Sequence, residues 1–179
     1  QIAKYKNLPK ASDNRVVITF TTTPEKIDKL KPMINSILDQ TVRVNHLIMV
    51  IPEYDKNKYK IPNYLKDIVT IIPSGKNYGE GTKLIPILLR EKESDTIIIA
   101  INDNIVYGKD FLQEMIENSN KNPDTVILDN NNNSILVKPT CFNNDVINRE
   151  KQKFDDNWFI SKAKNKKILN YRENYKCFS

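Results

Sequence analysis

The strongest constraint on the fold is an uninterrupted run at residues 95–101, Asp-Thr-Ile-Ile-Ile-Ala-Ile. β-Branched residues without polar interruption are typical of a strand in the middle of a parallel sheet, because both faces of such a strand are buried. Shorter runs of the same kind occupy residues 15–20, 46–51 and 68–72. Segments with helical patterns separate these runs, and the alternation predicts an α/β fold with a mostly parallel sheet covered by helices on both faces.

Apolar side chains at helical spacing predict a helix at residues 27–38, which Pro32 should kink or split. Segment 55–62, which is rich in lysine and contains Tyr59, is predicted to be a surface loop. The other predicted elements are helices at 82–90, 111–118 and 154–164, and strands at 125–128, 134–137 and 168–171.

Length and composition narrow the class of protein. Residues 1–179 suffice for one domain with its own core, and because the sequence does not begin with Met we expect this domain to be excised from a longer chain. The net charge of +6 and the pI near 9.2 come mostly from lysine. Lysine, asparagine and isoleucine have AT-rich codons, so this charge alone does not predict a nucleic-acid partner. No apolar run reaches the roughly 20 residues of a membrane span, and we expect a cytoplasmic protein.

The cysteines and the histidine do not suggest a metal site or a catalytic triad or dyad. Cys141 and Cys177 lie far apart with no CxxC spacing, and His46 is the one histidine of the sequence. These residues are too few for an ordinary zinc site, and a Ser-His-Asp or Cys-His mechanism would depend on His46 alone. We therefore expect two free thiols in a reducing compartment and a structural histidine.

Polar loops follow the four predicted parallel strands, at residues 21–23, 52–54, 74–83 and 102–104. In open α/β sheets, ligands bind in the crevice beyond the carboxyl ends of the strands. These loops should therefore converge on one crevice.

The last of these loops is Asn102-Asp103-Asn104, at the tip of the strongest predicted strand. A carboxylate and two carboxamides placed there cost desolvation unless they meet a cation or hydrogen-bond donors. Their oxygens suit Mg²⁺ or Mn²⁺, which would in turn hold a diphosphate. The alternative is an Asx turn that simply ends the strand.

Two further segments carry candidate chemistry. In segment 78–83 the glycines let backbone N–H groups approach a phosphate and Lys83 adds a positive charge, although a plain loop with a helix cap would have the same composition. Asp155 and Asp156 open a predicted helix beside Trp158. One of these carboxylates could serve as a general base, or both could simply cap the helix.

Several blocks of the sequence, in order, resemble the small GT-A-type glycosyltransferases. The nearest likeness is to family-2-like enzymes of giant DNA viruses and chlorella viruses, and it spans about residues 16–168. The blocks are residues 17–24, 40–41, 78–84, 101–105 with Tyr107, and 155–158.

The resemblance implies a GT-A fold and transfer of a sugar from a nucleoside-diphosphate-sugar, with a UDP-sugar favoured, to an acceptor hydroxyl. The acceptor would be a glycan or a protein-linked sugar, the anomeric configuration would invert, and neither nucleic acid nor a membrane span would be involved. A viral enzyme of this kind would act in the host cytoplasm or the virion.

The same likeness assigns roles to residues. Asp156 is implied as the general base, with Asp155 beside it, and Lys83 as the group that neutralises the diphosphate. Asp103 and Asn104 are implied as ligands of Mn²⁺ or Mg²⁺. The remaining implied donor-binding residues are Thr21, Thr22, Thr23, Pro24, Tyr78, Gly79, Thr82, Asn102 and Trp158.

One departure from the family concerns the metal. The family usually has two or three aspartates where this chain has Asn102-Asp103-Asn104. Fewer carboxylates should weaken divalent-metal affinity, although amide oxygens can still act as ligands. Three alternatives stay open: Asp103 anchors the metal alone, donor binding is partly metal-independent, or the domain is catalytically weak.

Three rival functions also stay open. Residues 79–86 resemble the Gly-x-Gly-Thr-Arg-Leu-x-Pro loop of sugar-1-phosphate nucleotidyltransferases, but that loop belongs after the first strand and here follows the third. A non-catalytic sugar-nucleotide-binding domain would account for the altered acidic motif. Lysine occurs with tyrosine at 55–60 and clusters without tyrosine at 162–167, and single-strand nucleic-acid binders can carry such stretches, but the scarcity of arginine and the acidic residues elsewhere favour solvated faces.

Overall fold

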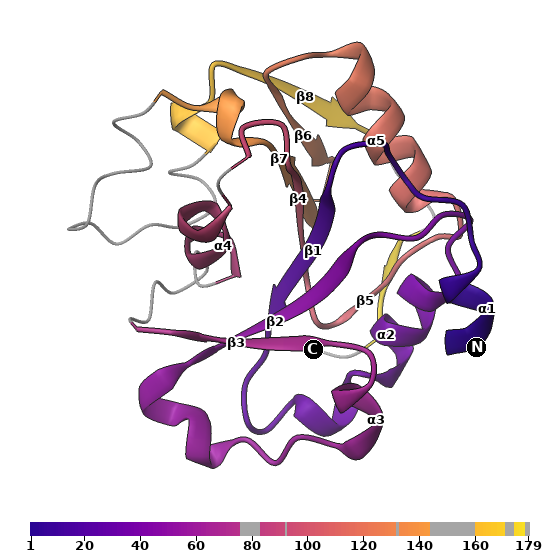
Figure 1. Ribbon diagram of the computed structural model, residues 1–179, viewed down its shortest axis with the longest axis vertical. Helices are drawn as coiled ribbons and strands as arrows, with labels where there is room; N and C mark the ends of the chain where they lie inside the picture. Colours follow the sequence, from indigo (N-terminus) through magenta and orange to yellow (C-terminus); the bar gives the residue numbers. More distant parts are fainter. Residues whose placement is uncertain (76–82, 92, 132, 144–159, 171–173, 178–179) are drawn as a thin grey trace.

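The computed structural model describes residues 1–75, 83–91, 93–131, 133–143, 160–170 and 174–177, and Figure 1 shows their arrangement. The main feature is a seven-stranded sheet with the strand order β3-β2-β1-β4-β7-β6-β8. A second, two-stranded sheet pairs β5 (Ile105–Val106) with β9 (Tyr175–Lys176). The strands of the main sheet are β1 (Val16–Thr21), β2 (His46–Pro52), β3 (Thr70–Ser74), β4 (Ile97–Ile101), β6 (Thr125–Asp129), β7 (Ser134–Val137) and β8 (Asn165–Leu169).

The main sheet is mostly parallel, which confirms the predicted fold class. Only β7 runs antiparallel to its neighbours, β4 and β6. β1 lies between β2 and β4, with Val17 opposite His46 on one side and opposite Ile98 on the other. Because β1 to β4 are parallel, the loops that follow their carboxyl ends lie at the same edge of the sheet.

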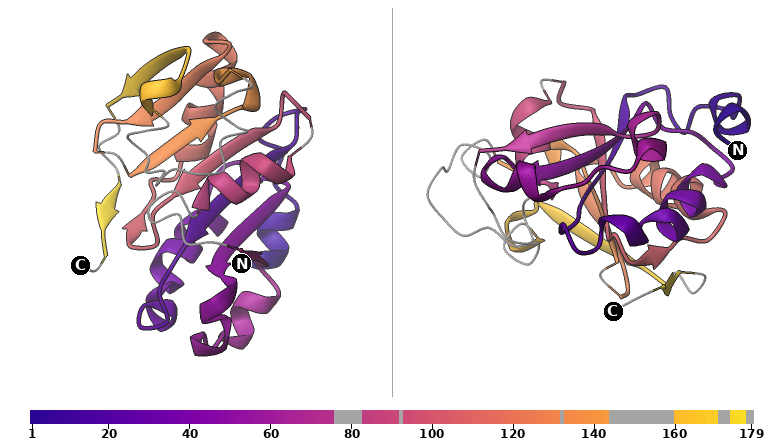
Figure 2. Two further views of the ribbon diagram at one scale, coloured as in Figure 1. Left: turned by 90° about the vertical axis from the view of Figure 1, so that its left-hand side faces the viewer. Right: turned by 90° about the horizontal axis from the view of Figure 1, so that it is seen from below.

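Helices cover both faces of the sheet, as Figures 1 and 2 show. α2 (Lys31–Leu38), α3 (Asn63–Lys66) and α5 (Phe111–Lys121) contribute to the apolar core on one face, and α4 (Ile85–Arg90) contributes to the core on the other. β4 supplies both cores, because alternate side chains of a strand point to opposite faces. Ile97, Ile99 and Ile101 belong to the core with α2 and α5, whereas Ile98 and Ala100 belong to the core with α4.

Other helices in the described ranges are short and include α1 (Ile2–Lys6) and the 3₁₀ helices η1 (Ile27–Lys29), η2 (Glu53–Lys58) and η4 (Pro139–Cys141). Pro32 divides the helix predicted at 27–38, since η1 ends at Lys29 and α2 begins at Lys31. Proline is tolerated there because backbone N–H groups in the first turn of a helix have no acceptor within the helix, so the N–H that proline lacks costs no hydrogen bond. Among the described segments, no helix has both the length and the apolar character needed to cross a bilayer.

Two predicted segments differ in the structure. The segment predicted as a surface loop at 55–62 begins inside η2, and Tyr59, directly after that helix, is partly buried. The strand predicted at 168–171 begins earlier, since β8 spans Asn165–Leu169. Of the helix predicted at 154–164, residues 160–162 are helical, and residues 154–159 lie outside the described part of the chain. β8 pairs with β6, and all its residues except Leu169 are exposed. Its sequence therefore lacks the apolar alternation by which a strand is recognised.

Candidate functional site

A cavity of about 430 Å³ opens at the carboxyl ends of β1, β2 and β4, a size within the usual range for small-molecule sites. Three of the loops predicted to converge line it, and Lys83 adds the end of the fourth. The lining residues are Thr21, Thr22, Thr23, Pro24, Glu25, Lys26, Pro52, Tyr54, Asp55, Tyr59, Lys83, Ile101, Asn102 and Asp103.

Asp103 follows β4 and is held from β1. The Thr22 hydroxyl donates to Asp103 Oδ2 at 2.8 Å, and Thr22 itself is buried. The carbonyl of Thr22 in turn accepts a hydrogen bond from the Tyr59 hydroxyl at 2.8 Å. This chain of contacts ties η2, β1 and β4 together around the carboxylate. A carboxylate offers about four acceptor positions, so Asp103 keeps capacity for a ligand.

Lys83 presents a buried positive charge to the same cavity. The residue is only 5% exposed, and its Nζ donates to Asn102 Oδ1 at 2.8 Å. Its backbone carbonyl accepts the Thr19 hydroxyl at 2.6 Å, which attaches this part of the chain to β1. Asn102 is a neutral amide, so this contact orients the ammonium without cancelling its charge. A cation held in this way is suited to a phosphate group.

The rim of the cavity contains residues that were not among the candidate site residues. Glu25 and Lys26 follow Pro24, and Asp55 follows Tyr54 in η2. Hydrogen bonds from its own backbone N–H and from the neighbouring Thr23 hydroxyl lower the pKa of Glu25. Glu25, Lys26 and Asp55 all lie shortly after the end of a strand, and this position is the signal in the sequence that could have identified them as site residues.

Tyr59 is another lining residue that was not a candidate. Burial, followed by the nearby carboxylates of Asp55 and Glu25, raises the pKa of Tyr59 to about 12. Its hydroxyl therefore stays protonated at neutral pH and can continue to donate to Thr22. Tyr59 thus lines the cavity next to η2 and connects this part of the chain to the residue that follows β1.

The oxygen ligands at the end of β4 suit a metal only in part. Within the described ranges, no group of three His, Cys, Asp or Glu residues could hold a metal ion. Asp103 is the carboxylate at the strand end, Asn102 Oδ1 accepts from Lys83, and Asn104 is not among the residues that line the cavity. Mg²⁺ is often held by one or two carboxylates together with substrate phosphates and water. The residues therefore fit a metal that binds together with a phosphate ligand.

Several candidate residues lie outside the described part of the chain. The general-base candidates Asp155 and Asp156 and the neighbouring Trp158 belong to this group, as do Tyr78, Gly79 and Thr82 of the glycine-rich segment. The position of Lys83, directly after that segment, is described.

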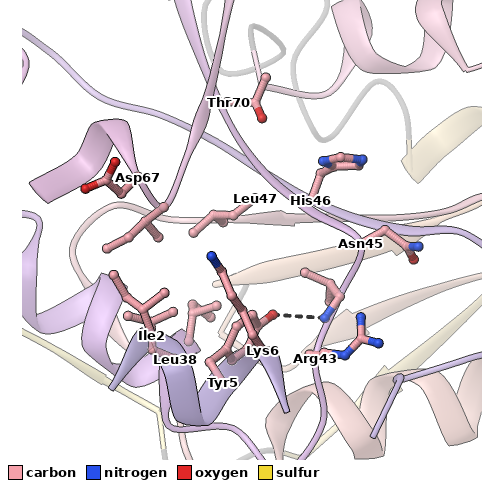
Figure 3. A pocket seen from close by; sticks show the side chains of 13 residues that line it. Ile2, Tyr5, Lys6, Leu38, Arg43, Asn45, His46, Leu47, Asp67 and Thr70 are labelled. Atoms are coloured by element: carbon pink, nitrogen blue, oxygen red, sulfur yellow. Dashed lines mark hydrogen bonds between the residues drawn. The ribbon is translucent and has the colours of Figure 1, made fainter. Parts of the chain in front are cut away.

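The histidine and the cysteines do not line this cavity. His46 begins β2, at the edge of the sheet opposite the crevice, where it lines a smaller cavity of about 210 Å³ (Figure 3). Tyr5 of α1 lies beside this second cavity, and its hydroxyl accepts the backbone N–H of Val44 at 2.9 Å. Cys141 is buried and Cys177 is half-buried, and neither forms a disulfide.

No protein-family model and no curated protein matches the chain. Solved structures do match it. Over 92% of this chain and 93% of the other, it is similar to 4-diphosphocytidyl-2C-methyl-D-erythritol synthase from Anaerococcus prevotii, with a TM-score of 0.60 and 9% identity. Over 91% and 92% of the two chains, it is similar to HddC from Yersinia pseudotuberculosis, with a TM-score of 0.55 and 14% identity.

A third similar structure is the glycosyltransferase GlyE from Streptococcus pneumoniae, with a TM-score of 0.52 and 12% identity. The match covers 88% of this chain and 45% of GlyE, so the chain spans less than half of that protein. Identities this low establish a shared fold and nothing about activity. The chain therefore has a mostly parallel, Rossmann-like α/β fold of the kind found in a glycosyltransferase and in a diphosphocytidyl-compound synthase.

Proposed function

We propose that this chain is a nucleotide-sugar-dependent glycosyltransferase. The observation that carries the proposal is that the buried Lys83 ammonium and the Asp103 carboxylate, which is held by Thr22, line the same cavity at the strand ends. Binding of a nucleotide-sugar requires a cation for the diphosphate, and Lys83 could supply it. It also requires a group for a metal or the ribose, and the Asp103 carboxylate could serve in this way. The order of the sequence blocks and the fold shared with a glycosyltransferase support the same conclusion.

In this proposal Thr21, Thr22, Thr23 and Pro24 hold the nucleoside, and Lys83 faces the diphosphate. Tyr78, Gly79, Thr82 and Asn102 complete the donor site, and Trp158 frames a sugar. Asp103 would hold Mn²⁺ or Mg²⁺, and Asn104, which does not line the cavity, would have to turn toward it to act as a second ligand. When bound, the metal would neutralise part of the charge of the diphosphate.

The reaction is a single displacement. The acceptor hydroxyl gives its proton to the Asp156 carboxylate while its oxygen forms a bond to the anomeric carbon. The bond from that carbon to the donor phosphate oxygen breaks, and the nucleoside diphosphate leaves with the electron pair. Lys83 stabilises the negative charge that develops on it. Attack opposite the leaving group inverts the anomeric configuration, and the favoured substrates are a UDP-sugar and a glycan or protein-linked sugar.

The test is a screen of UDP-, GDP- and dTDP-sugars with Mn²⁺ or Mg²⁺, measured by thermal shift and by release of nucleoside diphosphate. At least one nucleotide-sugar should raise the melting temperature and be hydrolysed or transferred. The Asp156→Asn variant should lose turnover by at least about 100-fold while keeping its affinity for the donor. If no nucleotide-sugar stabilises the protein or is turned over, the proposal is wrong. Donor binding without turnover in the unmutated protein would indicate a binding domain instead.

A second candidate is nucleotidyl transfer to a sugar phosphate. The fold similarity over nearly the full length of the diphosphocytidyl-compound synthase favours it. The position of the glycine-rich segment opposes it, since residues 79–86 follow β3 (Thr70–Ser74) while β1 leads into Thr22 and Thr23. Release of pyrophosphate from CTP or UTP in the presence of a sugar 1-phosphate would identify this activity.

A further inference from the structure

Tyr107 is a buried tyrosine next to the candidate donor site. It follows β5, is 3% exposed, and packs against Phe111 with the two rings tilted and 4.5 Å between their centroids. Its hydroxyl accepts the backbone N–H of Asn102 at 2.9 Å and donates to the carbonyl of Asn133 at 2.6 Å. Its own backbone N–H donates to Ser36 Oγ at 3.0 Å. Both ends of the residue are therefore held in place.

The partner on the far side of this hydroxyl is itself well held. Asn133 lies in the turn between β6 and β7, and its N–H donates to Asp129 Oδ1 at 2.8 Å. Asp129 is 2% exposed and also accepts the N–H of Asn131 at 2.9 Å. The Asn133 carbonyl thus belongs to a turn organised by a buried carboxylate. Tyr107 links that turn, rather than a loose loop, to the end of β4.

The partner on the near side belongs to the candidate site. The side-chain oxygen of Asn102 accepts a hydrogen bond from the Lys83 ammonium, its backbone N–H donates to the Tyr107 hydroxyl, and Asp103 is the next residue. A shift of the Asn102 backbone would therefore move both the lysine contact and the carboxylate. Burial, with a smaller contribution from Asp129, raises the pKa of Tyr107 well above its usual value. The hydroxyl consequently keeps the proton that it donates to Asn133.

We propose that Tyr107 is a positioning residue of the donor site, which fixes Asn102 and Asp103 against the β6–β7 turn for binding of the nucleoside diphosphate. This inference rests on the proposed function. Tyr107 is not a catalytic residue, because its hydroxyl faces two backbone groups rather than the cavity.

The Tyr107→Phe variant removes one oxygen and leaves the ring in place. The matched control is Tyr5→Phe, since Tyr5 also accepts a backbone N–H at 2.9 Å but lines the cavity beside His46 (Figure 3), where β2 begins, and not the candidate site where it ends. Burial likewise raises the pKa of Tyr5. Affinities for UDP, GDP and dTDP with Mn²⁺ are measured by calorimetry, and melting temperatures are measured for each variant. Hydrogen exchange of the backbone amides of residues 102–104 is followed by NMR.

We expect Tyr107→Phe to weaken nucleotide binding about tenfold, while Tyr5→Phe leaves it unchanged at a similar loss of melting temperature. Exchange of the Asn102 amide should accelerate in Tyr107→Phe only. If Tyr107→Phe is too unstable to study, Ser36→Ala removes the other anchor of Tyr107 and should weaken binding in the same direction.

Three results separate the possible failures. If hydrogen exchange of the Asn102 amide is unchanged in Tyr107→Phe, the positioning role is wrong, whatever the measured nucleotide affinities. Equal affinity of the unmutated protein and Tyr107→Phe also overturns it. If the unmutated protein binds none of the nucleotides, the proposed function fails, and the role of Tyr107 in donor binding fails with it.

Discussion

Replacing Lys83 by methionine tests the charge at the centre of the proposed site. The substitution removes the ammonium and keeps an unbranched side chain of similar length. Two unit charges about 4 Å apart attract by about 4 kcal/mol at an effective dielectric constant of 20. Desolvation of the diphosphate offsets part of this attraction, so we expect a net loss of about 2–3 kcal/mol, or about 30- to 150-fold in affinity.

Stability should respond differently from affinity. Lys83 is 5% exposed, and the removal of a buried charge relieves a desolvation cost. Asn102 Oδ1 loses one donor, whereas the bond from the Thr19 hydroxyl reaches the backbone of residue 83 and survives the substitution. We therefore expect the free energy of unfolding to change by no more than about 1 kcal/mol.

Calorimetric titration with UDP and GDP in the presence of Mn²⁺ measures the affinity, and chemical denaturation measures the stability. Lys26→Met is the matched control, because Lys26 lines the same cavity and the net charge changes equally. The control should lose no more than about threefold, since a more exposed charge is screened by solvent. Binding by Lys83→Met within threefold of the unmutated protein, or an equal loss in both variants, would refute the assignment of Lys83 to the diphosphate.

Two further predictions concern the metal and alkaline pH. Asp103→Asn should raise the Mn²⁺ concentration needed for half-maximal UDP binding at least about tenfold, and an unchanged Mn²⁺ titration would contradict a role for this carboxylate. Tyr59, with its pKa raised from 10.0 to about 12, keeps its proton between these pH values in the folded state, whereas the unfolded chain loses it. Stability should therefore be independent of Tyr59 below pH 10 and fall from there to about pH 12. Tyr59→Phe should make the decrease in melting temperature over this interval less steep.

The sheet was predictable because its signal is local. Ile97 to Ile101 are all buried in β4, and a short unbroken run of β-branched residues is typical of a strand that is buried on both faces. The order of strands and helices along the chain then implied parallel pairing and placed the polar loops at one edge. The sequence predicts the last strand at 168–171, whereas β8 spans Asn165–Leu169. The side chains of β8 are mostly exposed because it lies at the end of the sheet, and they therefore leave no apolar pattern in the sequence.

The contacts inside the candidate site were less predictable. Thr22 and Asp103 meet across 81 residues of sequence, and Tyr107 meets Asn133 across 26. Such pairs depend on strand order and register rather than on any local pattern. Residue types identified Lys83 and Asp103 as candidates, but only the structure showed which groups hold them. The burial of Tyr59 against β1 likewise required a tertiary contact that the composition of its segment did not indicate.

The asparagine at position 102 can be understood from its contact with Lys83. An aspartate in that place would hold the ammonium more tightly but would also neutralise it, which weakens its attraction for a phosphate. The amide orients Nζ at 2.8 Å and, being neutral, adds no negative charge beside it. The same exchange removes one negative charge from the ligands of a metal, so Asp103 would depend on the phosphates of the nucleotide to complete the coordination. Under the proposed function, the Asn-Asp-Asn motif would favour a site in which lysine holds the anion and a metal binds together with that anion.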